Sequence, residues 1–297
     1  MKWLLQALQA RWPGHWQVQE LGASGFCSTW RAQGPAGDCF VKTLPPAHAH
    51  TLLAEADGLQ ALASTHTLRV PRVLEARCDA EHGLAWLAME WLPLVAPGPA
   101  HGARLGEALG RLHQHPAPGG GRFGWPIENR LGPTPQTNTW SAASGLEGWL
   151  GFLRDQRLLA LAQRLQAARQ APALVQAVHQ VADRLPRFFD DGHRPRPALI
   201  HGDLWLGNCG ALAGDEPVVY DPAVSVSDPE MELALLELFG QPPAGFWPAY
   251  RAVAGLAEGY PRRRPLYQLY HLLNHVLIFG GGYERQAMGL AQALLRA

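Results

Sequence analysis

The most informative stretch of the sequence is His201-Gly202-Asp203-Leu204-Trp205-Leu206-Gly207-Asn208. It follows the short apolar run Ala198–Ile200, which predicts a buried strand that leads into a polar loop. Asp203 stands five positions before Asn208, the separation that joins a catalytic carboxylate to a metal-binding Asn in phosphoryl-transfer enzymes. The kinase form of this loop has an Arg before the Asp, where this chain has Gly202. Taken alone, the pattern also fits a turn Asp followed by a capping Asn.

A second carboxylate follows the next apolar strand, Val218–Tyr220, at Asp221. In phosphoryl transfer one carboxylate accepts the hydroxyl proton of the acceptor, while an Asn and a second Asp hold Mg²⁺ on the phosphates. Carboxylate and carbonyl oxygens are the ligands that this hard cation prefers. The spacing of Asp203, Asn208 and Asp221 therefore matches phosphoryl-transfer chemistry.

The first part of the chain supplies candidate ATP-binding groups. Lys42 ends a short apolar run, where a kinase places the lysine that reaches the ATP phosphates, and Glu55 lies thirteen residues later in a predicted helix. The stretch 21–28, with Gly25 and Ser28, is a turn of small residues suited to lie over phosphates. An ordinary hairpin turn explains it nearly as well, and Lys42 alone is more often a solvated strand lysine. The order of loop, Lys, Glu, Asp, Asn and Asp is what favours a kinase.

Composition narrows the class of protein. The 297 residues suffice for two domains, the apolar fraction of 47% argues against disorder, and 25 basic residues balance 25 acidic ones. This balance argues against nucleic acid or an anionic membrane as partner. No apolar run is long enough to span a membrane, and the start lacks the pattern of a signal peptide. Four scattered cysteines fit reduced thiols, so we expect a cytoplasmic protein; oligomeric state stays open.

Periodicity predicts an α+β protein with two lobes. Strands are expected at 40–42, 70–74 and 84–89, with a helix over 52–63, and a Pro/Gly-rich linker follows. We expect a β-rich ATP-binding lobe over 1–92 and a mostly helical catalytic and substrate-binding lobe over 93–297. The Gly/Pro-rich stretch 119–135 is predicted as a loop, and Arg262–Arg264 as a solvated loop.

The chain resembles the fructosamine (ketosamine) kinases, within the aminoglycoside-phosphotransferase-like and protein-kinase-like group, over nearly its whole length. The matching motifs are His201–Asn208 (H-G-D-L-W-x-G-N), Tyr220–Ala223 (Y-D-P-A), Glu237–Gly240 (E-L-F-G), Phe123–Trp140 (F-G…G-x-T-P-Q-x-N-x-W) and Leu266–His275, which ends in L-N-H. The P-Q-x-N-x-W and L-N-H segments are the narrower ones. They favour ketosamine kinases over aminoglycoside or choline kinases.

The resemblance implies a bilobal protein-kinase-like fold and ATP-dependent phosphorylation of the 3-hydroxyl of a ketosamine, with ATP and Mg²⁺ as cofactors. The unstable 3-phosphate then frees the amine, which is deglycation repair of a small ketosamine or a glycated protein lysine. The same resemblance makes Asp203 the base and makes Asn208 and Asp221 the metal ligands. It implies that Lys42 contacts phosphate and that Glu55 orients this lysine. It also makes Glu90-Trp91-Leu92 the hinge whose backbone meets adenine.

Four further residues are candidates for the acceptor site: Asn138, Trp140, Trp205 and His275. Aromatic faces suit the C–H surfaces of sugars, but plain core tryptophans are equally expected. For His275 a helix–helix contact is slightly favoured. Where the family carries an aromatic residue and then G-x-R/S-E, this chain reads Val224–Glu230, with Pro229 expected at the first turn of a helix and Ser227 or Asp228 as its cap.

Two other functions remain open at this stage. One is a kinase of another small hydroxyl compound, such as an aminoglycoside or an amino alcohol, which an acidic acceptor pocket would favour. The other is a nucleotide-binding pseudokinase without turnover, against which the complete set of Lys42, Glu55, Asp203, Asn208 and Asp221 argues.

Overall fold

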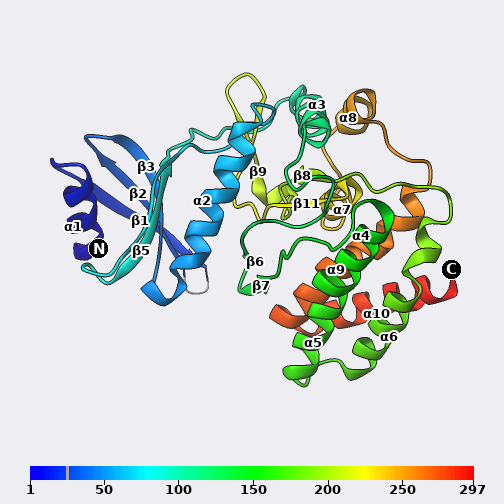
Figure 1. The fold of residues 1–297 in the computed structure, drawn as a ribbon. Coiled ribbons are helices and arrows are strands. Elements are labelled where there is room, and N and C mark those ends of the chain that lie inside the picture. Colours follow the sequence, from blue (N-terminus) through cyan, green and yellow to red (C-terminus); the bar gives the residue numbers. More distant parts are fainter. Residues whose placement is uncertain (25–26) are drawn as a thin grey trace. The chain divides into compact units, whose positions relative to one another are not determined.

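The computed structural model describes residues 1–24 and 27–297, and these form two compact units (Figure 1). Unit 1 comprises Met1–His101 and Cys209–Pro222, and unit 2 comprises Gly102–Asn208 and Ala223–Ala297. The first is rich in strands and the second in helices, which confirms the predicted α+β class.

Unit 1 is built on a five-stranded antiparallel sheet with strand order β1-β2-β3-β5-β4. Its elements are α1 (Lys2–Arg11), β1 (Gln17–Ser24), β2 (Cys27–Gly34), β3 (Gly37–Leu44), η1 (Pro46–His48), α2 (Ala49–Ser64), β4 (Val73–Asp79), β5 (Leu84–Glu90), β9 (Cys209–Leu212) and β10 (Glu216–Val219). β4 begins three residues later than predicted, after Pro71, which cannot donate to a ladder.

Alternation along β3 positions the lysine of the candidate site. Successive side chains of a strand point to opposite faces of its sheet. Cys39 and Val41 are fully buried in the cluster that α1 closes with Leu4 and Leu8. Lys42 therefore points to the opposite face of the sheet.

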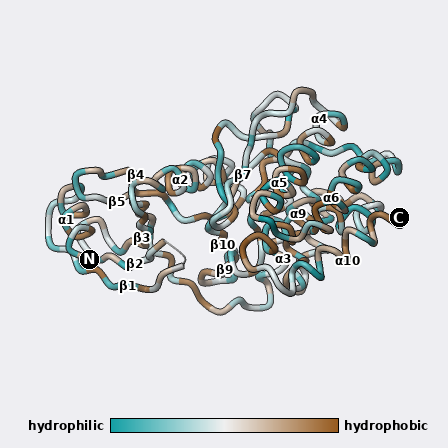
Figure 2. The backbone as a smooth tube through the Cα atoms, turned by 90° about the horizontal axis from the view of Figure 1, so that it is seen from below, coloured by the Kyte–Doolittle hydropathy of each residue, from teal (hydrophilic) through white to brown (hydrophobic). Residues whose placement is uncertain are grey.

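Unit 2 is a helical body that carries short strand pairs. Its elements are α3 (His101–Gln114), β6 (Asn129–Leu131), β7 (Thr134–Gln136), α4 (Gly145–Phe152), the π-helical turn η2 (Leu153–Leu158), α5 (Leu159–Ala167), α6 (Pro172–Asp183), η3 (Leu185–Phe189), β8 (Ala198–Ile200), η4 (Leu206–Asn208), β11 (Ser225–Ser227), α7 (Pro229–Leu236), α8 (Phe246–Ala254), α9 (Tyr260–Phe279) and α10 (Gly282–Arg296). Figure 2 shows hydrophobic residues recurring along these helices between hydrophilic ones. Their apolar faces meet around α9, whose Leu266, Leu269 and Leu273 are fully buried.

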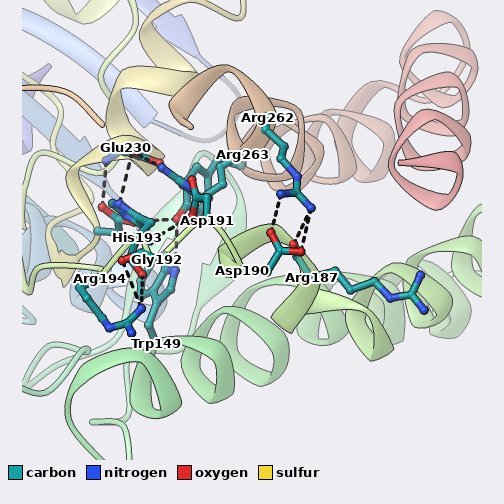
Figure 3. A network of polar contacts seen from close by, with 12 residues as sticks. Trp149, Arg187, Asp190, Asp191, Gly192, His193, Arg194, Glu230, Arg262 and Arg263 are labelled. Carbon is teal, nitrogen blue, oxygen red and sulfur yellow. Dashed lines mark hydrogen bonds and ion pairs between the residues drawn. The ribbon is translucent and has the colours of Figure 1, made fainter. Parts of the chain in front are cut away.

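Two of the predicted loops are wrong. The stretch 119–135 contains β6 and the start of β7, which pair as a hairpin with Asn129 opposite Gln136. Arg262–Arg264 lies in α9, and the side chain of Arg263 is completely buried between Glu230 and Asp191 (Figure 3).

The start of α7 is as predicted. Pro229 is its first residue, and the carboxylate of Asp228 accepts the backbone N–H of Glu230 at 3.3 Å. Among the described residues, no helix is both long and apolar enough to cross a membrane.

Candidate active site

An ion cluster in unit 1 joins three of the predicted site residues. Lys42 on β3 reaches across to α2, where its Nζ donates to Glu55 Oε1 at 2.8 Å. The same Nζ donates to Asp221 Oδ1 at 2.7 Å. The Lys42 side chain is only 10% exposed, whereas that of Asp221 is 46% exposed. The structure thus brings a buried cation, its buried partner and an accessible carboxylate together.

Electrostatics keep the lysine charged. Burial lowers the pKa of Lys42. The charges of Glu55 and Asp221 and their hydrogen bonds raise it by more, so the net shift of the Lys42 pKa is upward. Burial raises the pKa of Glu55 to about 7; the charge of Lys42 opposes this rise and that of Asp221 adds to it. A charged, fixed ammonium group is what the phosphates of a nucleotide require.

Asp221 follows β10 in an unusual backbone conformation. Its φ of 60° lies in the left-handed region, which Asp tolerates better than most residues with a Cβ. The residue is held there by the bond of its side chain to Lys42. Its exposed carboxylate is a hard oxygen donor, the ligand type of Mg²⁺.

The catalytic-loop candidate lies in unit 2, directly after β8. Glu232 on α7 accepts the backbone N–H of His201 at 2.5 Å and that of Gly202 at 3.1 Å. Its other oxygen lies 3.1 Å from Nε2 of the buried His113. The loop is therefore anchored through its backbone to a buried carboxylate. Neither Glu232 nor His113 was among the predicted site residues, although a glutamate within the apolar run of α7 is a detectable signal.

Gly202 explains the departure from the kinase form of the loop. Its φ is +83°, and a Cβ at this position would lie 2.0 Å from the carbonyl oxygen of Ala223. Only glycine fits such a close approach without displacing backbone. The loop and the segment after Asp221 thus pack through main-chain atoms, and Ala223 N–H donates to His201 O at 2.8 Å.

Asp203 and Asn208 contact each other within the loop. The Asn208 Nδ2 donates to the Asp203 carbonyl at 2.8 Å and to its Oδ2 at 3.3 Å, and Asp203 N–H donates to His201 Nδ1 at 3.3 Å. With its NH₂ group turned to Asp203, Asn208 offers its carboxamide oxygen to a cation. The oxygen donors of Asn208 and Asp221 suit Mg²⁺ chemically.

The other ATP-site candidates lie in unit 1. Gly25 is outside the described residues, and Ser28 lies in β2 opposite Thr43. Trp91 donates its N–H to Asp38 O at 3.1 Å, and the guanidinium of Arg31 lies 4.5 Å from its ring. The Glu90 side chain accepts the Arg72 N–H at 2.7 Å, and the Leu92 carbonyl accepts the Leu94 N–H at 2.9 Å. The hinge candidate is therefore a well-anchored segment.

The acceptor-site candidates fall into two places in unit 2. Trp205 in the catalytic loop is 41% exposed and meets Phe239 edge-to-face at 6.4 Å. His275 on α9 lies 4.7 Å from the Phe239 ring, and its Nδ1 is 2.8 Å from the His271 carbonyl. Burial lowers the pKa of His275, which favours the neutral ring. These aromatic groups form one continuous surface beside the loop.

Asn138 and Trp140 lie in the other place, after β7. Asn138 is 1% exposed; its Oδ1 accepts from Arg157 at 2.8 Å and its Nδ2 donates to the Ile127 carbonyl at 3.2 Å. Trp140 is half-buried, with the Arg122 guanidinium 5.8 Å from its ring. In this structure Asn138 holds the backbone of its own segment.

Comparison with known proteins identifies the family. The family model described as fructosamine kinase matches residues 9–297. A Synechocystis protein named a probable ketoamine kinase is 40% identical over 260 residues, which are 86% of this chain and 83% of that protein. A chloroplastic protein-ribulosamine 3-kinase of Arabidopsis thaliana is 34% identical over 290 residues, covering 94% of this chain and 84% of the relative.

A crystal structure gives the same result for the fold. The crystal structure of a Thermobifida fusca protein assigned as a fructosamine-3-kinase matches this chain with a TM-score of 0.82 and 36% sequence identity. The match covers 95% of this chain and 94% of the Thermobifida fusca chain. The kinase-like α+β fold that the motifs predict is confirmed. The chain therefore belongs to the fructosamine kinase family.

Proposed function

We propose that this protein transfers the γ-phosphoryl group of ATP to the 3-hydroxyl of a ribulosamine or fructosamine. As a member of the fructosamine kinase family, it is an ATP-dependent phosphotransferase with a hydroxyl group of a ketosamine as acceptor. The observation that supports the chemistry best is the buried ion cluster of Lys42, Glu55 and Asp221, held in a chain that also carries the Asp203–Asn208 loop.

In the proposed step the acceptor 3-oxygen forms a bond to the γ-phosphorus, and the bond from that phosphorus to the β,γ-bridging oxygen breaks. The hydroxyl proton passes to Asp203, and ADP leaves with the bridging oxygen. Glu232 fixes the backbone of the loop, so that Asp203 is presented without reorganisation.

The nucleotide-binding roles follow from charge. Lys42 would contact phosphate, Glu55 would hold that lysine, and Asn208 and Asp221 would hold Mg²⁺, which offsets the charge on the phosphates when bound. Gly25 and Ser28 are proposed to cover the phosphates and Glu90–Leu92 to meet adenine. We assign ATP binding to the lobe over 1–92, and we assign acceptor binding and catalysis to the lobe over 93–297.

The proposed role is repair. The 3-phosphate of a ketosamine is unstable, and its loss frees the amine, so a small glycated metabolite or a glycated protein lysine would be restored. The Arabidopsis relative is named for ribulosamine, which favours the shorter sugar as substrate. We propose the cytoplasm as the location, with no nucleic acid as partner, consistent with balanced charge and with four cysteines that form no disulfide with one another in the described part of the chain.

Two other functions are less well supported. A kinase of aminoglycosides or amino alcohols would not need the P-Q-x-N-x-W and L-N-H segments of this family. A pseudokinase would not need Asp203, whose backbone is braced by buried groups.

The test is ATP consumption with the Nε-ribulose and Nε-fructose adducts of lysine, followed by assay of free lysine. Wild type should turn over at least one adduct, and Asp203→Asn should lower kcat by about a hundredfold or more, because a positioned base contributes that much. The ratio of the two wild-type rates identifies the sugar. Asp203→Asn should still be stabilised thermally by Mg-ATP, which serves as the folding control. Tight Mg-ATP binding without turnover of either adduct would refute the assignment.

A further inference from the structure

An apolar hollow opens on the surface of unit 2, where the end of α9 meets the start of α10. Its volume is about 490 Å³. Its walls are Leu238 and Phe239 after α7, Phe279 at the end of α9, and Tyr283 and Gln286 on α10. Below, "the α9–α10 hollow" means the space between these side chains. The residues that line it, all in the described part of the chain, include no charged side chain, so the lining suits a neutral, apolar group.

The hollow is open to solvent and does not belong to the packed core. Phe279 is 65% exposed and Phe239 is 39% exposed. Gly280 and Gly282 complete the lining without adding side chains, and a Cβ at Gly280 would have no atom within 4 Å. An exposed apolar patch around a concave space is typical of a binding site.

Aromatic rings connect the hollow to the catalytic loop. The ring centroid of His275 lies 4.9 Å from that of Tyr283, 5.6 Å from that of Phe279 and 4.7 Å from that of Phe239. Phe239 in turn meets Trp205 edge-to-face at 6.4 Å. These are the separations at which aromatic rings contact one another. The aromatic surface is therefore continuous from the hollow to Trp205.

The catalytic loop holds Trp205 at the near end of this surface. A Cβ at Gly207 would lie 2.2 Å from the Trp205 ring, so the ring lies directly against the backbone of the loop. The Trp205 carbonyl accepts the Asn208 N–H at 2.9 Å, and Asn208 Nδ2 donates to the Asp203 carbonyl at 2.8 Å. Direct contacts therefore lead from the proposed base to the hollow, all within unit 2.

The chemistry of the hollow indicates which part of an acceptor it suits. The sugar and the nitrogen of a ketosamine are polar and belong at Asp203, so the apolar hollow suits a group beyond the nitrogen. Free lysine would bring a charged carboxylate and ammonium group there, which an uncharged lining cannot pair. In a glycated protein the lysine is part of a peptide chain, whose residues each advance it by about 3.3 Å. A side chain one or two residues away is then close enough to enter.

We propose that the α9–α10 hollow binds a large apolar side chain that neighbours the glycated lysine of a protein substrate, so that the enzyme selects glycation sites by their sequence. This inference rests on the proposed function and narrows its substrate class. Phe279 and Tyr283 would contact the side chain with their rings, and Phe239 would contact it on the side toward Trp205. A few aromatic contacts of this kind usually dominate the binding of a short segment.

The experiment compares blocked tripeptides that carry the same ketosamine on the lysine Nε. In one series Phe or Gln precedes the glycated lysine and Gly follows it; in the other Gly precedes it and Phe or Gln follows. Wild type should prefer Phe to Gln by about tenfold in kcat/KM in at least one series, because burial of an aromatic ring against apolar surface is worth about that factor. The preference should arise through KM. The series that shows it gives the direction in which the peptide crosses the hollow.

Variants assign the preference to the hollow. Phe279→Ala should bring the ratio of Phe to Gln peptides close to one, and Phe279→Leu should leave an intermediate ratio, because part of the apolar surface remains. Ile127→Ala is the matched control: Ile127 is 40% exposed in unit 2 and does not line the hollow. It should keep the wild-type ratio. Thermal stabilisation by Mg-ATP checks that each variant is folded.

The outcomes separate the two levels of inference. Equal kcat/KM for Phe and Gln in both series, or turnover of the free lysine adduct but of no peptide, would overturn this proposal while the kinase function stands. Equal values together with a wild-type dimer that Phe279→Ala dissociates would make a second copy of the chain the occupant instead. An unchanged preference in a folded Phe279→Ala would overturn the assignment to the hollow. Failure of wild type to turn over any ketosamine would overturn the proposed function, and this inference with it.

Discussion

At the scale of single residues, the buried Lys42–Glu55 pair carries the most chemistry. Removing two charges from water is costly, and an ion pair repays this only with good geometry and further hydrogen bonds. Here the ammonium group has two carboxylates at 2.8 and 2.7 Å. The arrangement therefore fits preorganisation for phosphate better than a contribution to stability.

Protonation of Glu55 should switch this preorganisation off. Because burial raises its pKa to about 7, the carboxylate form is lost as the pH falls through neutrality, and Lys42 loses a partner. We expect kcat/KM for ATP to rise between pH 6 and 8 with an inflection near 7. Glu55→Gln should lower the plateau by about tenfold and remove the inflection, as measured in initial rates over that range.

Glu75 provides the control for this profile. It lies in β4 and pairs with Arg11 at the surface, so Glu75→Gln should keep the inflection. An inflection near pH 7 that persists in Glu55→Gln would mean that another group titrates.

Sequence reasoning can select residues whose chemistry is visible in their type and spacing. It assigned Lys42, Glu55 and Asp221, which the structure brings together although Asp221 is far away in the chain. It missed Glu232, because this residue acts through the backbone N–H groups of a loop on another element. A contact of that kind leaves no spacing pattern.

At the scale of elements, a polar network fixes the start of α7 (Figure 3). His193 Nε2 lies 2.9 Å from Asp228 Oδ2, which also accepts from the Tyr267 hydroxyl at 2.7 Å. Arg263 on α9 forms two bonds to Glu230, at 2.7 and 3.0 Å. The departure from the family pattern at Val224–Glu230 is therefore accommodated by a well-capped helix.

This network should make stability depend on pH. Burial lowers the pKa of His193, and the charge of Arg263 lowers it slightly further. The hydrogen bond and charge of Asp228, together with the charge of Glu230, raise it by more, so the pKa of His193 lies above 6.5. Its stabilisation is then complete below pH 6.5 and lost as the pH rises through the folded-state pKa. His193→Gln should lower Tm by about 3 °C or more at pH 6, and by less at pH 8.5.

Calorimetry of both proteins from pH 5.5 to 8.5 measures this difference. A control is His179→Gln, because His179 is exposed on α6. A difference between wild type and His193→Gln that grows with pH would contradict the assigned sign.

Element prediction failed where tertiary contacts override local signals. The Gly/Pro-rich stretch 119–135 reads as loop, yet Asn129 and Gln136 pair across a hairpin whose side chains bind the carbonyls of Val224 and Ala223. Arg263 belongs to a basic run typical of a solvated surface, and the carboxylates of Glu230 and Asp191 make its burial favourable. Both features depend on residues far away in sequence.

At the scale of the whole molecule, neither unit is a continuous stretch of the chain. Cys209–Pro222, which ends in the Asp221 loop, belongs to unit 1 although it follows the catalytic loop of unit 2. Among the contacts that attach it there, Val219 N–H donates to Arg69 O at 3.0 Å, Val95 N–H donates to Ala211 O at 2.8 Å, and the Asp215 carboxylate accepts from Gly98 and Ala100. Length and composition predicted two lobes, but an excursion of this kind depends on non-local pairing.

Asp215 is the residue through which this attachment can be tested. Its two oxygens accept the N–H groups of Gly98 and Ala100 at 2.8 and 3.0 Å, just before the chain passes from unit 1 to unit 2. Its φ of 63° also suits Asp or Asn better than Ala. Asp215→Ala should therefore cost about 2 kcal/mol of unfolding free energy, and Asp215→Asn about half as much, because one acceptor and the backbone preference remain.

Hydrogen exchange shows whether that loss is local. In Asp215→Ala, amides of 95–101 and 209–222 should exchange faster than in wild type, while those of α9 and α10 stay unchanged, since opening of a weakly attached segment does not require global unfolding. The KM for ATP should rise with it, because the same segment carries Asp221 next to Lys42. Uniformly faster exchange across both units, with an unchanged KM, would instead mean that Asp215 supports only global stability.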